Sequence, residues 1–155
     1  MGLTLEFYAG DPDAIGPAVA DADFDLLYKS DVVTKRADFS LHIQPKDLDT
    51  LSLQVADMLG QSPVLLQESL GDAIGGDESD HGAFLVAAEW VSQVAGLQPS
   101  VSAELTKRWI SEMARIYEDE QIAVTPEAEE AVSSLILLCR FAVETDTPVI
   151  HSWFL

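Results

Sequence analysis

The sequence predicts a single α+β domain over residues 1–155, with a small, mostly antiparallel sheet packed against about five helices. Apolar and polar residues alternate near the start of the chain, and an apolar segment ends it; both patterns are typical of strands. The acids are also unevenly distributed: residues 1–78 hold 12 Asp and 3 Glu, whereas residues 79–155 hold 3 Asp and 9 Glu. Because Asp favours turns and caps while Glu tolerates helix interiors, the second half should be mostly helical.

The first half is expected to contain short strands and one helix. Leu3, Leu5 and Phe7 alternate with polar residues and predict an opening strand. The turn signal at residues 11–13 predicts a short helix that ends near Ala20. Three more short strands are expected after it, over residues 24–28, 32–34 and 38–43, with an antiparallel ribbon turning near residues 35–37.

The second half is expected to be built from amphipathic and buried helices. Thr125, Pro126 and Glu127 supply a cap residue, a proline at the first helical position and an acid that the helix dipole favours. Residues 149–155 then predict a last strand; if it returns beside the first strand, one sheet closes against the helical layer. The spacing of apolar residues predicts five helices, over residues 45–60, 63–74, 83–97, 105–117 and 125–145.

The composition argues against several functions. With 8 Lys and Arg against 27 Asp and Glu, the formal net charge is −19. Nucleic-acid backbones and anionic membranes both attract clustered Lys and Arg, so neither is expected as a partner. The apolar segments are too short to span a membrane, and no secretory leader or cofactor motif is visible, so we expect a cytoplasmic protein without a cofactor. A GC-rich genome or adaptation to salt would also explain the acidity.

Two charged residues in apolar surroundings are the candidates for a catalytic or ligand site. Glu89 and Arg140 each lie between apolar neighbours. A buried charge is costly without a partner, so we expect the two to pair across packed helices, or Arg140 to pair with Glu144. The alternative is a small-molecule pocket or catalytic site around Glu89 and Arg140, to which His151 of the last strand is the histidine that could contribute.

Potential metal ligands are densest between Asp77 and His81. Glu78 and His81 have the i,i+3 spacing found in carboxylate-bridged di-iron sites, but a second copy of this pair is missing. We therefore predict no metal site, and Asp77, Glu78 and His81 are the residues to inspect for one. The alternative without a metal is a solvated loop in which Ser79 or Asp80 caps a helix beginning near residue 82. The single cysteine, Cys139, excludes an intrachain disulfide and is expected to be a buried apolar residue.

The chain ends on three apolar residues, Trp153, Phe154 and Leu155. We expect them to belong to a strand docked on the core; the alternative is an exposed anchor for another subunit or partner.

The functional prediction is a non-enzymatic protein–protein interaction module, of the immunity-protein or antitoxin kind, whose acidic surface binds a basic protein partner. Two alternatives stay open: a small-molecule-binding protein or small enzyme with a pocket around Glu89 and Arg140, and a structural homo-oligomer.

Overall fold

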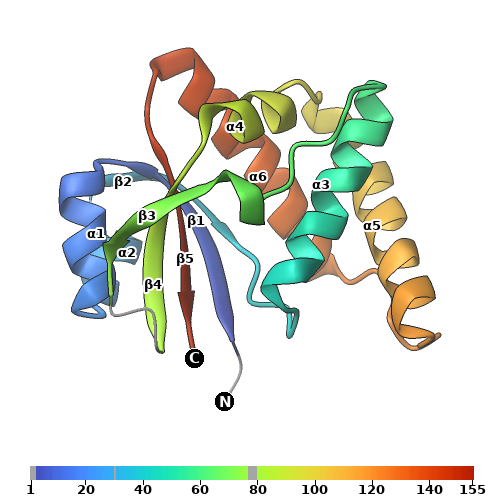
Figure 1. Cartoon of the computed structure of the whole chain (residues 1–155), viewed down its shortest axis with the longest axis horizontal. Helices are drawn as coiled ribbons and strands as arrows, with labels where there is room; N and C mark the ends of the chain where they lie inside the picture. Colours follow the sequence, from blue (N-terminus) through green and yellow to red (C-terminus); the bar gives the residue numbers. More distant parts are fainter. Residues whose placement is uncertain (1–2, 30, 77–79) are drawn as a thin grey trace.

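The two ends of the chain pair at the centre of an antiparallel sheet (Figure 1). The computed structural model describes residues 3–29, 31–76 and 80–155. Its five strands lie in the order β2-β1-β5-β4-β3, so the last strand of the chain is the middle one. The strands are β1 (Thr4–Gly10), β2 (Val33–Asp38), β3 (Leu70–Gly75), β4 (His81–Val86) and β5 (Val149–Phe154). The α+β class and the predicted strands at both ends of the chain are confirmed.

Helices begin and end where local chemistry favours it. Thr125 accepts a hydrogen bond from the backbone N–H of Ala128 at 3.1 Å, as expected of a helix cap. Gly60 has a φ of +65°, the left-handed conformation that glycine adopts easily at a helix end. The helices are α1 (Pro12–Ala20), α2 (Phe24–Lys29), α3 (Pro45–Leu59), α4 (Ala88–Ala95), α5 (Ser102–Tyr117) and α6 (Pro126–Thr145), with short 3-10 turns at Gln67–Ser69 and Pro99–Val101.

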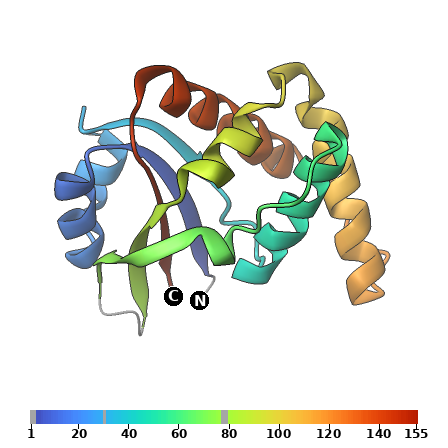
Figure 2. The same ribbon diagram turned by 45° about the horizontal axis from the view of Figure 1, so that its top comes forward.

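Helices cover both faces of the sheet. In Figures 1 and 2, α1 and α2 lie on one side and the other helices on the opposite side. The larger core is formed against α3–α6 by residues such as Phe7 and Trp90, whose rings stack at 5.5 Å. The smaller core lies under α1 and α2 and includes Tyr8 and Ile150. Since β1 is covered on both sides, its polar alternation does not mark a solvent-exposed face.

Several predicted elements are wrong in type. Residues 24–28 form helix α2, where Asp23 accepts a hydrogen bond from the N–H of Leu26 at 3.1 Å and so favours a helical turn. Residues 35–37 lie within strand β2, so the predicted ribbon turn is absent. Residues 63–74 include the 3-10 turn and most of β3, and residues 83–97 begin as strand β4 before α4 starts. Short apolar runs fit a buried strand as well as a buried helix, so periodicity does not separate the two.

Close packing of α1 on β3 depends on two glycines. A Cβ atom on Gly75 would lie 2.0 Å from the carbonyl oxygen of Gly16, and one on Gly16 would lie 2.4 Å from the carbonyl oxygen of Ile74. The two backbones therefore approach more closely than any side chain allows. Over the described ranges no helix combines the length and apolar character that crossing a bilayer needs.

Candidate functional site

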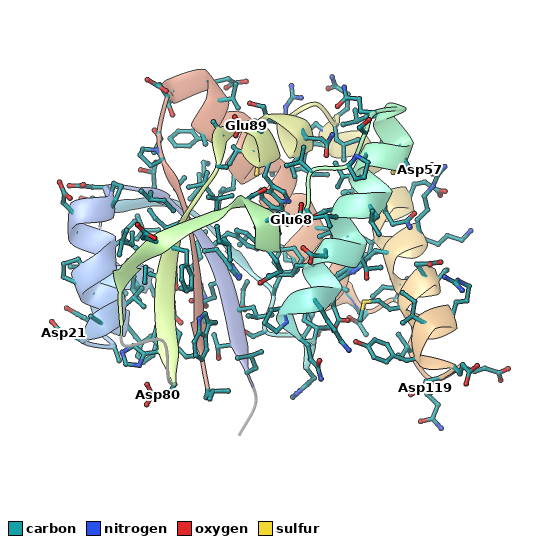
Figure 3. The ribbon with its side chains drawn as sticks, viewed as in Figure 1. Asp21, Asp57, Glu68, Asp80, Glu89 and Asp119 are labelled. Carbon is teal, nitrogen blue, oxygen red and sulfur yellow. The ribbon has the colours of Figure 1, made fainter. Side chains whose placement is uncertain are left out.

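The structure does not bring Glu89 and Arg140 together. Glu89 is exposed in the first turn of α4 (Figure 3), and its carboxylate makes no ion pair with any residue that the structure describes. Arg140 instead donates from Nη1 to the carbonyl oxygens of Ala95 and Leu97, at 3.1 and 3.0 Å. The expected ion pair is therefore a wrong prediction. The dipole at the N-terminus of α4 favours the carboxylate of Glu89. The carbonyl groups at the C-terminus of α4 lack partners within the helix, so they accept hydrogen bonds from Arg140.

His151 lies on β5 and is 2% exposed. Its Nδ1 donates to the backbone oxygen of Glu6 at 3.0 Å, and its ring lies 4.5 Å from the ring of Phe7. Burial lowers the pKa of His151 to about 4, although the bond to Glu6 opposes the shift. The imidazole is therefore neutral at pH 7.

Of the three candidate metal ligands, the structure describes only His81. Asp77 and Glu78 lie outside the described residues. His81 opens β4; its Nδ1 pairs with the carboxylate of Asp80, and its Nε2 bonds to the carbonyl oxygen of Ala20 at 3.0 Å. The predicted helix near residue 82 is thus a strand. Within residues 3–29, 31–76 and 80–155, no three His, Cys, Asp or Glu side chains are grouped as metal ligands would be.

The apolar chain end belongs to the central strand. Phe154 is buried and packs against Phe24 of α2, with ring centres 5.2 Å apart. Trp153 is half-buried on the opposite face of the sheet, and only the Leu155 side chain is largely exposed, at 63%. Most of the apolar surface of these three residues is therefore used inside the fold.

A buried carboxylate on β1 was not among the predicted site residues. Glu6 is 1% exposed and accepts hydrogen bonds from the hydroxyls of Tyr8 and Tyr28 and, at 2.7 Å, from Nη2 of Arg36. Burial and the nearby charge of Glu6 raise the pKa of both tyrosines, so both hydroxyls remain donors. The Arg36 guanidinium also covers the Tyr28 ring at 4.0 Å. This cluster joins α2 to two strands, and both carboxylate oxygens of Glu6 accept hydrogen bonds within it.

An open hollow of about 620 Å³ lies between the start of α3, the end of α5 and the segment that leads into α6. Its apolar lining residues include Leu41, Ile110, Met113 and Ile122. We call it the α3–α5 hollow. Its size is within the range of about 300–1,000 Å³ that is common for ligand pockets.

Asp47 organises the polar side of the α3–α5 hollow. It accepts hydrogen bonds from the backbone N–H of Gln44 at 2.7 Å and from the Tyr117 hydroxyl at 2.5 Å, and its backbone oxygen accepts the Trp109 indole N–H at 2.9 Å. The bond to the Asp47 carboxylate raises the pKa of Tyr117 to about 12. These groups therefore satisfy one another, and the exposed His42 and Asp119 are further polar residues that line the hollow.

The segment beside this hollow is strongly acidic. No Lys or Arg occurs between Arg115 and Arg140. We call residues 118–130 the acidic segment; Asp119 also lines the hollow and lies at the outer end of α5 in Figure 3. Its acids are Glu118, Asp119, Glu120, Glu127, Glu129 and Glu130, all exposed. The carboxylate of Asp119 accepts from the N–H of Gln121, and none of the other five side chains makes a hydrogen bond or ion pair with a described residue.

Several cations of the described chain are bound to other groups, and Lys46 lies over Tyr117, which lines the hollow, with its Nζ 5.4 Å from the ring centre. Arg36 binds Glu6, and Arg140 binds carbonyl groups of the α4 end. The remaining ion pairs of Lys and Arg that the structure describes are Lys29–Asp25, Arg36–Asp38, Arg108–Asp57, Arg108–Glu104 and Arg115–Glu112. The carboxylates near the α3–α5 hollow are therefore left to solvent or to a partner.

The fold and site therefore define a single α+β domain with an acid-bordered hollow. Comparisons with protein-family models, with curated proteins and with solved structures give no match to this chain. Function must then be inferred from the residues themselves. Little in the sequence pointed to Glu6 and Asp47, because their burial depends on which helices cover β1 and the start of α3. The acidic segment was visible as a run without cations.

Proposed function

We propose that this protein is a non-enzymatic interaction module that binds a basic protein partner at the α3–α5 hollow and the acidic segment. The observation that carries the proposal is that the acidic segment, whose six carboxylates are all exposed, also contributes Asp119, Ile122 and Ala123 to the lining of the α3–α5 hollow. A partner segment with Lys or Arg residues around one apolar side chain matches this surface. Covering a basic surface in this way is what an immunity protein or antitoxin does.

Electrostatics and apolar contact have separate roles in this proposal. The unpaired carboxylates attract a basic partner over long distances and raise the association rate, an effect that salt weakens. The apolar floor provides the contact that survives screening, because a buried anchor side chain contributes most of the binding free energy at an interface. Binding should therefore weaken with salt without being abolished by it.

The test begins with capture of partners from a lysate of the native host, at low and then raised salt, followed by affinity measurement with the purified partner. A triple variant, Glu118→Lys, Glu120→Lys and Glu130→Lys, reverses charge in the acidic segment outside the first turn of α6. A matched variant, Asp21→Lys, Asp72→Lys and Glu144→Lys, makes the same change in net charge at exposed positions elsewhere. We expect the first variant to weaken binding roughly a hundredfold and the second less than about threefold.

A variant that fills the hollow separates its role from that of charge. Ala123 is exposed and lines the hollow, so Ala123→Trp should block it without disturbing the core, and Ala88→Trp on α4 is the matched exposed control. A basic partner lost with the first substitution and kept with the second supports the proposal. Equal effects of the two triple variants, binding that ignores salt, or recovery of the protein only with further copies of itself would overturn it; the last result would favour the homo-oligomer.

A further inference from the structure

We propose that a second, separate pocket next to the two chain ends binds a small aromatic molecule that carries one hydrogen-bond donor, such as a phenol. The pocket has a volume of about 370 Å³. It is bounded by strands β3, β4 and β5 and by the start of α3, on the face of the sheet opposite α1 and α2. We call it the terminal pocket.

The walls of the terminal pocket are mainly apolar and partly aromatic. Phe84 and Trp153 line it from neighbouring strands, and Leu70 and Pro45 close it from the other side. Gly82, paired with Trp153 across the strands, leaves space for the indole: a Cβ atom at Gly82 would lie 3.1 Å from Nε1 of Trp153. Flat aromatic walls favour an aromatic ligand, because offset stacking adds to the burial of apolar area.

One polar atom in this apolar wall has no partner. His151 lines the pocket and uses Nδ1, as a donor, to bond the carbonyl oxygen of Glu6. Since Nδ1 carries the proton, Nε2 of the neutral ring is an acceptor, and it makes no hydrogen bond to any residue that the structure describes. No fully buried side-chain nitrogen or oxygen among the described residues is without a partner, so Nε2 must reach the open space of the pocket.

A ligand donor would satisfy this acceptor. His151 is 98% buried, so little water competes for Nε2, and an O–H or N–H group placed there gains a hydrogen bond in a largely apolar site. A purely apolar ligand of the same shape would instead cover Nε2 and leave it unsatisfied. The Nε2 acceptor therefore favours a donor on an otherwise apolar molecule, and Gln67, which lines the same pocket, is a further polar side chain there.

The tryptophan indole N–H signals provide a direct test by ¹H–¹⁵N NMR. The chain has three tryptophans. The N–H of Trp90 is bonded to Ser52 and that of Trp109 to the backbone oxygen of Asp47, both at 2.9 Å, so these two report on the fold. Titration with p-cresol should shift the Trp153 signal in a saturable way and leave the other two unchanged. Trp153→Phe identifies the signal.

A matched pair of ligands and a variant of His151 isolate the hydrogen bond. p-Xylene has the shape of p-cresol with a methyl group in place of the hydroxyl, and it is the more apolar of the two. In His151→Asn the amide N–H can keep the bond to the backbone of Glu6 while the Nε2 acceptor is lost. We expect this variant to shift the ratio of the two dissociation constants roughly fivefold to tenfold toward p-xylene, the effect of one hydrogen bond.

The results of the p-cresol titrations are independent of the results of the partner-binding experiments. A saturable Trp153 shift whose preference for p-cresol depends on His151 supports the inference. No saturable shift with either ligand, equal shifts of all three indoles, or the same preference in both proteins would overturn it. If His151→Asn does not fold, p-cresol must still bind the wild-type protein at least as tightly as p-xylene, or the acceptor has no role. The triple variant of the acidic segment should bind p-cresol normally, whatever happens to its protein partner.

Discussion

Replacing His151 by Asn should remove a pH-dependent part of the stability of the fold. In the folded chain burial lowers the pKa of His151 to about 4, below the ordinary value of 6.5. Between these two values the unfolded state binds a proton that the folded state does not. Stability from this group is therefore fully present above about pH 6.5 and is lost as the pH falls toward 4.

The size of the effect follows from the two pKa values. With a folded value of about 4 and an ordinary value of 6.5, protonation of the unfolded state at pH 5 lowers the free energy of unfolding by about 2 kcal/mol relative to pH 7.5. All other titratable groups are common to the wild type and to His151→Asn, so the difference between the two proteins isolates the imidazole.

Urea denaturation of both proteins at pH 5 and at pH 7.5 measures this difference. The stability advantage of the wild type over His151→Asn should be about 2 kcal/mol larger at pH 7.5 than at pH 5. An advantage that is equal at both pH values would refute the reasoning, because it would mean that the ring is as easily protonated in the folded chain as in the unfolded one. Near pH 6.5 about half of the imidazoles in the terminal pocket would then be protonated, and a protonated ring presents no acceptor.

Three other predictions concern residues whose roles the structure defines. Arg140→Met should lower the free energy of unfolding by about 1–2 kcal/mol through loss of the two bonds to carbonyl groups, whereas Glu89→Gln should change it by less than about 0.5 kcal/mol, both by urea denaturation. Gly75→Ala should lower the free energy of unfolding by about 3 kcal/mol, because the new Cβ atom would lie 2.0 Å from the carbonyl oxygen of Gly16 in α1. Gly71→Ala in the same strand should leave the free energy of unfolding nearly unchanged in the same assay. Burial raises the pKa of Cys139, so a thiol reagent such as Ellman's should modify it only after unfolding in guanidinium; equal rates with and without denaturant would count against its burial.

The elements with strong local signals were predictable from the sequence. Thr125 and Pro126 define the start of α6, and the alternation of residues 3–8 predicts β1, because capping and the alternation of apolar and polar side chains are properties of neighbouring residues. The hairpin of β3 and β4 was missed because its apolar residues satisfy a helix as well as a strand. Its assignment depends on the close approach of α1 at Gly75, which only the three-dimensional fold supplies.

The same limit explains why the buried polar residues were missed. In β1, Glu6 alternates with Leu5 and Phe7 and so resembles the exposed side of a half-buried strand. It is buried because α1 and α2 cover the second face of the sheet, and it is tolerated because Arg36, brought alongside by the β1–β2 register, supplies a counter-charge. Glu89 shows the reverse error: Trp90 and Val91 after it are buried, but the carboxylate of Glu89 is exposed on the helix.

The arrangement of charges separates a binding role for the acidic segment from a general effect of composition. Adaptation to salt or a GC-rich genome would add carboxylates over the whole surface without regard to its shape. Unpaired acids such as Glu89 and Glu144 do occur elsewhere, but residues 118–130 hold six acids and no Lys or Arg, and several residues of this segment line the α3–α5 hollow. If acidity serves only hydration, charge reversal should have the same effect on partner binding at any exposed position. If it serves recognition, only reversal within the acidic segment should matter, and the two triple variants differ in this respect alone.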